Sequence, residues 1–513
     1  MNARTLIGAT APSILIGLLL TGCATTKAPP APSQEAIESV TVFDADTVLK
    51  RVVYDLKNNR PQAANDTLVT LIEEEFDNLS AIQQHHALFL EAVCALQLRE
   101  FPRALTLAQT SSALPDATAE DWALRLQAAT ANRDLADAAI SLTHLARLDT
   151  RALNSFKKEY VMRLVSETAK LSDTEIRYNL LYALYDARYV ADVGTSSDYL
   201  WYSLALLMLE KGEMDQAADV INNLHNTLPT LFMRVDKRFA AFVAANPQKF
   251  DMKRVAAAEV EYWQQVIDHN PRSLSAVYSE INALLVNQQY EQALQVADAA
   301  MEKIELGTPE SAFDDADTVN WLANIRATAL SKLGQFDAAS KQMQIASEAL
   351  ENGHANVSQL LNLAEFQVVL KRPQEALDTL QRLSAATSGY GKMTLENIRH
   401  LAAIQMNNAA ERQRSMVYIA EHRSDAPAVY VEALLDEGDL DSAAQVVIQN
   451  VTDPKERAHT LASWQTYQEG EQTPVALERS QTIKRLMSRE DMQTVFHQYG
   501  VIETFAIDRP PGI

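Results

Sequence analysis

The side chains that build metal sites and catalytic triads are present in this chain, but their spacing matches neither kind of site. Of the ten histidines, only His85 and His86 are adjacent, and neighbouring residues on a helix do not share a face. The patterns His-Glu-x-x-His, Cys-x-x-Cys and Gly-x-Ser-x-Gly are all missing from the sequence. We therefore expect no catalytic residue, no metal ligand and no enzymatic activity.

Two short acidic clusters invite comparison with calcium loops. Asp314-Asp315-Ala316-Asp317 lacks the alternating ligands and the central glycine of such a loop. It stands just before a predicted helix that carries Trp321, where carboxylates satisfy free backbone N–H groups and complement the helix dipole. We expect this cluster, and Asp44-Ala45-Asp46 likewise, to cap helices.

The N-terminus has the features of a secretory signal over residues 1–22. Arg4 supplies a positive charge, and the apolar run that follows is too short to span a bilayer. The run ends in Leu20-Thr21-Gly22-Cys23, which resembles the bacterial lipoprotein box. The resemblance implies cleavage before Cys23 and acylation of its thiol and its new amine, so the expected cofactor list is empty apart from this covalent lipid.

Several acyl chains on one residue hold a protein firmly to a membrane, because each buried CH₂ contributes about 0.8 kcal/mol. Ala24, where an inner-membrane lipoprotein has Asp, resembles the outer-membrane sorting pattern. Three prolines between residues 23 and 44 predict a stiff, extended tether. Cys94 lies in an apolar helical context, so we expect it to be buried, and no disulfide supports the fold.

Tyrosines are concentrated between residues 178 and 202. The first four are spaced 4, 3 and 4 residues apart, so on one continuous helix they form a single stripe. The stripe is either buried in helix packing or lines a groove, where tyrosine combines a large contact area with a polar tip. The six tyrosines are Tyr178, Tyr182, Tyr185, Tyr189, Tyr199 and Tyr202.

The elements that position these residues are predicted to be helices. Glycine is scarce, with 14 residues in all, whereas strand-rich folds need glycine-rich turns at short intervals. Strong helix formers dominate instead, which predicts an all-α fold. The formal net charge of −22 excludes electrostatic binding to nucleic acid or to anionic lipid.

A short pattern recurs along the chain. Gly212-x-Met214-x-x-Ala217, Gly334-x-Phe336-x-x-Ala339 and Gly438-x-Leu440-x-x-Ala443 each follow one apolar helix and open another. Glycine accepts a positive φ just past a helix end, and alanine lets two antiparallel helices approach closely. Other units place Asn, Lys or Arg at the turn. Further alanines expected on second helices are Ala64, Ala104, Ala138, Ala293 and Ala376.

These units resemble the tetratricopeptide repeat. The best copy runs Trp201-x₂-Leu204-Ala205-x₂-Met208 and continues to Ala217 and Pro229. The resemblance implies a superhelical solenoid of helix–turn–helix pairs whose first helices line a groove. By that resemblance, the further groove candidates are Tyr199, Tyr202, Tyr278, Trp321 and Asn324.

The expected organisation has five segments. They are a signal peptide (1–22), a lipidated cysteine with its tether (23–44), an N-terminal solenoid (45–245), a C-terminal solenoid (246–455), and a helical cap with an extended tail (456–513).

A solenoid leaves a long curved surface exposed to partners. Together with the resemblance to tetratricopeptide-repeat outer-membrane lipoproteins, this predicts a protein–protein interaction scaffold anchored in the outer membrane and facing the periplasm. Its expected partners are envelope proteins of assembly, secretion or cell-wall machinery. The alternative is a glycan-binding module, for exopolysaccharide or peptidoglycan, that uses tyrosines as stacking platforms.

Overall fold

The computed structural model describes residues 44–316, 319–348, 350–351, 354–383 and 389–513. These residues form two compact units, which divide between Ala191 and Asp192. The boundary lies earlier than the predicted one at 245/246, because helices on either side of residue 246 pack against each other within the second unit.

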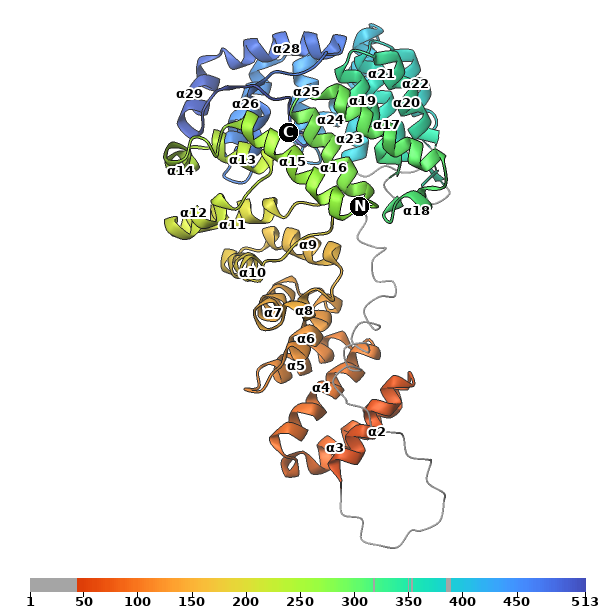
Figure 1. The fold of residues 1–513 in the computed structure, drawn as a ribbon, viewed down its shortest axis with the longest axis vertical. Helices are drawn as coiled ribbons and strands as arrows, with labels where there is room; N and C mark the ends of the chain where they lie inside the picture. Colours follow the sequence, from red (N-terminus) through yellow and green to blue (C-terminus); the bar gives the residue numbers. More distant parts are fainter. Residues whose placement is uncertain (1–43, 317–318, 349, 352–353, 384–388) are drawn as a thin grey trace. The chain divides into compact units, whose positions relative to one another are not determined.

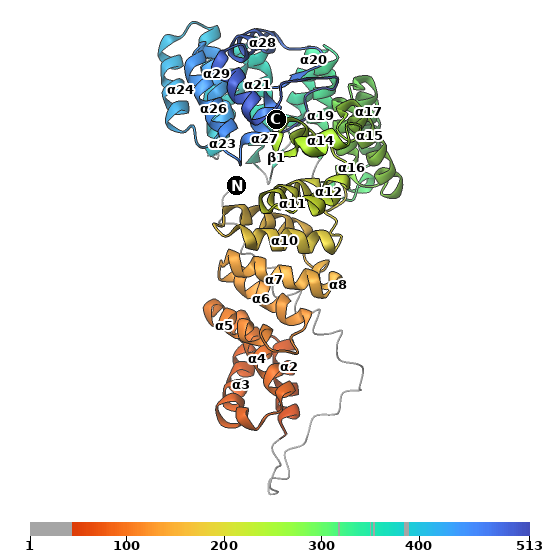
Figure 2. The same ribbon diagram turned by 90° about the vertical axis from the view of Figure 1, so that its left-hand side faces the viewer.

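Layers of antiparallel helices build the N-terminal unit, residues 44–191 (Figure 1, Figure 2). Its elements are α2 (Ala45–Lys57), α3 (Pro61–Glu75), η1 (Phe76–Asn78), α4 (Ala81–Gln97), α5 (Phe101–Ser112), α6 (Ala119–Ala131), α7 (Leu135–Leu148), α8 (Thr150–Leu153), α9 (Lys158–Glu167), η2 (Thr168–Lys170) and α10 (Thr174–Asp186).

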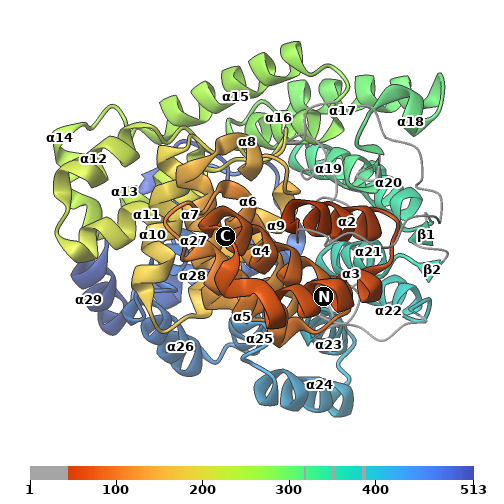
Figure 3. The same ribbon diagram turned by 90° about the horizontal axis from the view of Figure 1, so that it is seen from below.

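Helix pairs also build the C-terminal unit, residues 192–513, and follow one another around it from α15 to α26 (Figure 3). Its first elements are α11 (Asp198–Lys211), α12 (Met214–Asn222), α13 (Thr227–Val235), η3 (Lys237–Phe239), α14 (Ala240–Ala245), α15 (Met252–His269), α16 (Leu274–Val286), α17 (Tyr290–Glu305), α18 (Pro309–Ala312), α19 (Val319–Lys332) and α20 (Phe336–Glu348). The hairpin β1 (Leu350–Glu351) and β2 (His354–Ala355) is antiparallel, with Leu350 opposite Ala355.

The later elements of this unit are α21 (Val357–Val369), α22 (Pro373–Leu380), α23 (Gly389–Gln405), α24 (Ala409–Glu421), α25 (Pro427–Glu437), α26 (Leu440–Thr452), α27 (Arg457–Ser463), β3 (Thr466–Tyr467), α28 (Pro474–Met487), α29 (Glu490–Tyr499) and β4 (Thr504–Phe505). Strands β3 and β4 pair in parallel, with Thr466 opposite Thr504. None of the helices in the described part of the chain has the length and the apolar composition that a membrane crossing requires.

One type of turn closes most of the helix pairs. A residue with φ between 51° and 77° ends the helix, and the N–H of the next residue donates to the carbonyl oxygen five residues earlier, at 2.8–2.9 Å. This geometry satisfies carbonyls that a helix end leaves free. The left-handed residues are Asn59, Arg99, Arg133, Arg188, Gly212, Gln288, Gly334, Lys371, Asn407 and Gly438.

Nine of these turns lead directly into a second helix within the described residues. The pairs are α2–α3, α4–α5, α6–α7, α11–α12, α16–α17, α19–α20, α21–α22, α23–α24 and α25–α26. The predicted all-α, tetratricopeptide-like array of helix pairs is therefore confirmed.

The alanines that the sequence places on second helices are buried in eight of the nine pairs. All are at most 2% exposed, namely Ala64, Ala104, Ala138, Ala217, Ala293, Ala339, Ala376 and Ala443. Each stands in the first turn of its second helix. Because a protein interior is close-packed, a larger side chain there would push the two helices apart.

Candidate partner-binding faces

The tyrosine stripe of the N-terminal unit is shorter than the sequence predicts. Tyr178 and Tyr182 lie on α10 with ring centroids 6.0 Å apart, and Tyr182 is 39% exposed, while Tyr185 is half-buried. Tyr189 does not continue the stripe, because α10 ends at Asp186 and Arg188 takes the left-handed turn. The Tyr189 ring is buried, and its backbone N–H closes the turn on Leu184.

Two tyrosines of α11 differ sharply in exposure. Tyr202 is 8% exposed, with its ring centroid 5.6 Å from that of Phe232 and 5.9 Å from that of Phe239. Burial raises the pKa of Tyr202 far above its ordinary value. Tyr199 is 46% exposed, although partial burial and nearby Glu259 raise its pKa to about 12. Tyr202 therefore belongs to the core, as the packing interpretation has it, and Tyr199 keeps an accessible face.

Three groove candidates lie on neighbouring first helices of the C-terminal unit. Trp321 on α19 is 42% exposed, whereas Tyr278 on α16 is half-buried and packs against the core between these pairs. Asn324, one turn after Trp321, has a buried side-chain oxygen that accepts no hydrogen bond in the structure. Helices α16 and α19, which carry the three residues, pack against each other. Their role in partner binding stays a prediction.

Within the described residues, Asp44 caps the predicted helix and Asp315 caps a different one, while Asp317, the cluster member nearest α19, lies outside the described residues. Asp44 caps α2 and accepts from Asp46 N–H at 3.2 Å, as expected. Asp315 instead caps α16, where it accepts from Leu274 N–H at 2.6 Å and from Ser275 N–H at 2.8 Å. Burial opposes the charge of Asp315, but these hydrogen bonds outweigh it and lower its pKa.

The chain's own C-terminal segment covers part of the first-helix face of the C-terminal unit. Helix α28 packs against α21, α25 and α26. Arg479 on α28 makes a two-pronged ion pair with Asp436 on α25, at 2.7 Å through Nε and 2.6 Å through Nη2. Lys371 in the turn after α21 pairs with Glu478. Nothing in the periodicity of residues 474–487 distinguishes this helix from one that would continue the repeat.

The last residues of the chain are held by a buried carboxylate. Asp508 is 1% exposed and accepts from Tyr290 Oη at 2.7 Å, from Lys332 Nζ at 2.7 Å and from Gly470 N–H at 3.2 Å. Burial and this hydrogen bond to Asp508 raise the pKa of Tyr290. The network thus joins the tail to α17 and to the end of α19.

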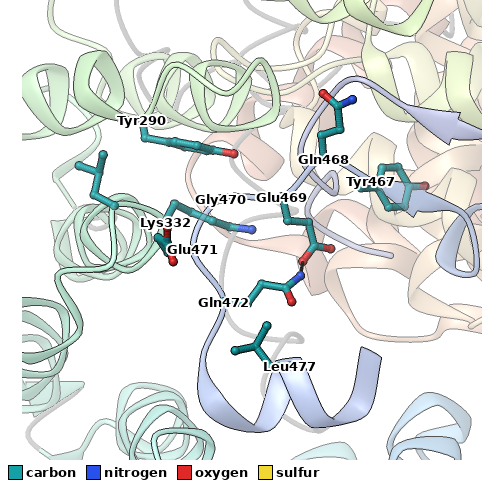
Figure 4. Close-up of a pocket in the computed structure, with 10 residues that line it drawn as sticks. Tyr290, Lys332, Tyr467, Gln468, Glu469, Gly470, Glu471, Gln472 and Leu477 are labelled. Atoms are coloured by element: carbon teal, nitrogen blue, oxygen red, sulfur yellow. Dashed lines mark hydrogen bonds between the residues drawn. The ribbon is translucent and has the colours of Figure 1, made fainter. Parts of the chain in front are cut away.

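A cleft of about 660 Å³ opens beside this network (Figure 4). Tyr290, Lys332, Tyr467, Glu469 and Glu471 are among the residues that line it. Glu469 accepts from Arg509 Nε at 2.9 Å, and this ion pair outweighs burial and lowers its pKa. The sequence does not single out these residues, because they come from elements far apart along the chain.

Of the two cysteines, only Cys94 lies within the described residues. Cys94 is buried, and burial raises the pKa of its thiol to about 12, so it is an unreactive core residue as predicted. Cys23, with the signal and most of the tether, lies outside the described residues. The described part of the chain holds no group of three or more His, Cys, Asp or Glu side chains that could bind a metal ion.

Comparisons with known proteins add little to this geometry. No protein-family model matches the chain, and no curated protein matches it. Among solved structures, the chain is similar to one described as the crystal structure of the APC/C hetero-tetramer Cut9-Hcn1. The identity is 13%, the match covers 89% of this chain and 90% of that chain, and the TM-score is 0.27. The assignment of the fold therefore depends on the helix pairs and turns described above.

Proposed function

We propose that the chain is an interaction scaffold of the bacterial envelope, held by a lipid on Cys23 at the periplasmic face of the outer membrane. The observation that carries the proposal is the exposure of large aromatic side chains on helix faces that repeat packing leaves uncovered. Tyr182 and Trp321 are 39% and 42% exposed. Aromatic residues are enriched at protein interfaces, where they supply contact area at a low entropy cost. The proposal includes no catalytic step.

Crosslinking in intact cells tests the scaffold. A photoactivatable residue at Trp321 should capture an envelope protein, while one at Ile345 should not. Ile345 lies on second helix α20 and is a matched control, because it is 51% exposed. In the N-terminal unit the same comparison pairs Tyr182 with Leu148, which is 54% exposed. Equal capture at test and control positions would mean that the first-helix faces have no special role.

The anchor is tested separately. Cys23→Ala should abolish incorporation of labelled palmitate and should leave the signal, residues 1–22, attached, because the motif that directs both steps is lost. The support for this part is the Leu20-Thr21-Gly22-Cys23 motif at the end of an apolar run. Palmitate label that persists on the Cys23→Ala protein would contradict a lipid anchor at this residue.

Glycan binding is the second candidate, and the cleft beside Tyr290 and Tyr467 favours it. Two aromatic rings together with carboxylate and amide groups suit a sugar, which needs both stacking and hydrogen bonds. Affinity electrophoresis against peptidoglycan fragments and exopolysaccharide should show retardation that Tyr467→Ala reduces. Unretarded migration in both gels would leave protein partners as the only candidate.

A further inference from the structure

Helix α28 lies on the C-terminal unit with one stripe of residues inward. Four of its residues are spaced 4, 3 and 4 apart and therefore share a stripe, namely Val475, Arg479, Thr482 and Leu486. Val475 and Leu486 are at most 3% exposed, and the arginine between them donates to Asp436 of α25 at 2.7 Å and 2.6 Å. This is the spacing with which a helical ligand is anchored in a groove.

The surface beneath α28 has a partner for each part of this stripe. Val475 belongs to the apolar cluster that includes Leu361 of α21 and Leu395 of α23. The Asp436 side chain is 6% exposed and accepts both of the shorter bonds from the Arg479 guanidinium. We call this surface, the apolar cluster together with Asp436, the α28 face. Its occupant needs an apolar residue and, four positions later, an arginine.

Few residues hold α28 in place. Val475 and Leu486 are the only buried residues among its 14, whereas eight of 13 residues are buried in α21. Leu477 is 52% exposed and lines the cleft at the start of α28 (Figure 4). Elements with few buried apolar contacts open locally at a lower free energy than the core does. We therefore expect α28 to leave its face more readily than the repeat helices separate.

The chain on either side of α28 is held independently of it. Before the helix, Gly470 N–H donates to the buried carboxylate of Asp508 at 3.2 Å. After it, α29 packs against α26, and Met492 and Phe496 of α29 are fully buried. Residues 472–489 can thus leave and return while the rest of the unit stays folded.

The charge of α28 is opposite to that of the chain as a whole. The helix has three basic residues and one acidic residue, a net charge of +2, whereas the whole chain has a net charge of −22. Complementary charge steers association and selects among partners. A partner that takes the place of α28 should therefore be basic as well.

We propose that the α28 face is a partner-binding groove and that α28 is its displaceable internal occupant. The partner is a basic amphipathic helix that presents an apolar residue and an arginine as Val475 and Arg479 do. The proposal rests on the scaffold function proposed above and adds regulation to it. Because α28 is tethered, its effective concentration at the face is high, and the partner's apparent affinity falls with the fraction of chains in which the face is covered.

Hydrogen exchange on the full-length chain tests whether α28 leaves its face. Amides of residues 474–487 should exchange at least about 100-fold faster than those of α26, because they open without global unfolding. Amides of α29 should stay protected, since that helix is held independently. Protection of α28 equal to that of α26 would overturn the proposal.

A peptide supplied in trans tests what the face binds. The probe is a fluorescein-labelled peptide of residues 473–488, and fluorescence anisotropy gives its Kd. Arg479→Glu in the full-length chain places a carboxylate against Asp436, so α28 should be released and the probe should bind with a Kd at least about tenfold lower than for the unmodified chain. Arg485→Glu is the control, with less than about a twofold effect. It makes the same change in charge on the same helix, where Arg485 is exposed and donates to Thr482 of α28 itself.

Equal Kd values for the Arg479→Glu and Arg485→Glu chains would overturn the proposal, as would equal binding of a peptide with alanine in place of Arg479. Hydrogen exchange needs no variant, so it decides the matter if Arg479→Glu folds poorly. Failure of both tests with capture intact at Trp321 of α19 would leave the scaffold standing and reject this inference alone. Absence of capture at Trp321 and at Tyr182 would reject the scaffold itself.

Discussion

His85 on α4 is buried between two carboxylates that lie beyond its own helix pair. Its Nδ1 is 3.0 Å from Asp116 Oδ2, and its Nε2 is 2.7 Å from Asp121 Oδ1 on α6. Burial by itself lowers the pKa of His85, but hydrogen bonds and attraction from Asp121 and Asp116 outweigh it, so the pKa is raised. The histidine thus links α4 to the next pair, and the link is strongest when the ring is charged.

This link predicts a pH-dependent stability. A histidine whose pKa is higher in the folded state stabilises fully below its unfolded pKa of about 6.5, and the stabilisation is lost as the pH rises through the folded pKa. The difference in melting temperature between the unmodified chain and His85→Gln should therefore be largest near pH 5.5 and should shrink toward pH 9. The exposed neighbour His86, changed to Gln, is the control. A difference that does not vary with pH would mean that His85 is neutral in the fold.

Tyr199 and Tyr202 allow packing and binding to be separated on one helix. Tyr202→Ala should lower the free energy of unfolding by about 3 kcal/mol, because it opens a cavity beside Phe232 and Phe239. Tyr199→Ala should cost about 1 kcal/mol or less, since its side chain is 46% exposed. Urea denaturation measures both. A Tyr202→Ala protein of full stability that no longer binds its partner would restore Tyr202 as a groove residue.

At the scale of elements, the turns explain how much of the fold the sequence reveals. Glycine at residues 212, 334 and 438 makes three helix pairs recognisable in the sequence, because only glycine adopts a positive φ without cost. Seven equivalent positions hold Asn, Arg, Gln or Lys, and five of these turns are visible only through the buried alanine that follows. The turns at Arg188 and Asn407 lack even that alanine, because Val193 and Arg412 stand in its place. Local residues are therefore enough to predict helix pairs, but not their exact number.

The glycine requirement gives a prediction for single turns. A non-glycine residue in the left-handed region costs about 1–2 kcal/mol, which the extra flexibility of glycine partly offsets. Arg133→Gly should therefore stabilise the N-terminal unit by about 0.5–1 kcal/mol, because Arg133 is exposed with φ 61°. Gly438→Ala should destabilise the C-terminal unit by about 1 kcal/mol, since a Cβ there meets no atom within 4 Å and only the φ of 75° matters. In urea denaturation, the free energy of unfolding should therefore rise for Arg133→Gly and fall for Gly438→Ala.

The candidate site is less predictable than the fold, because it depends on contacts between distant segments. The tyrosine stripe is correctly placed on α10, but Arg188 ends that helix before Tyr189. Asp315 lies close in sequence to the helix carrying Trp321, yet it caps α16, about 40 residues earlier. Arg479 and Asp436 are 43 residues apart, and no periodicity indicates that they meet. Such long-range pairs are set by how the solenoid winds.

At the scale of the whole chain, the C-terminal tail ties together parts of the C-terminal unit that are far apart in sequence. Arg234 of α13 pairs with Glu503 at 2.7 Å, and Val501 N–H donates to Val235 O at 3.0 Å. Further along, Asp508 N–H donates to Val286 O at 2.9 Å, and its carboxylate accepts from Lys332. Helix α13 near the start of the unit also packs against α27 near its end. The unit is thus closed by its own last residues.

Removal of this closure should loosen the C-terminal unit and leave the N-terminal unit unchanged. Asp508→Ala leaves Lys332, Tyr290 and the Gly470 N–H without their shared acceptor, so the free energy of unfolding should fall by about 2–4 kcal/mol. Asp441→Ala is the control, because its ion pair with Arg489 is exposed and is worth under about 1 kcal/mol. Hydrogen exchange should accelerate in the turn between α16 and α17, and exchange in residues 44–191 should not change, since the contacts of Asp508 all lie within the C-terminal unit. Faster exchange in both units would show that they unfold together and that the tail also stabilises the N-terminal unit.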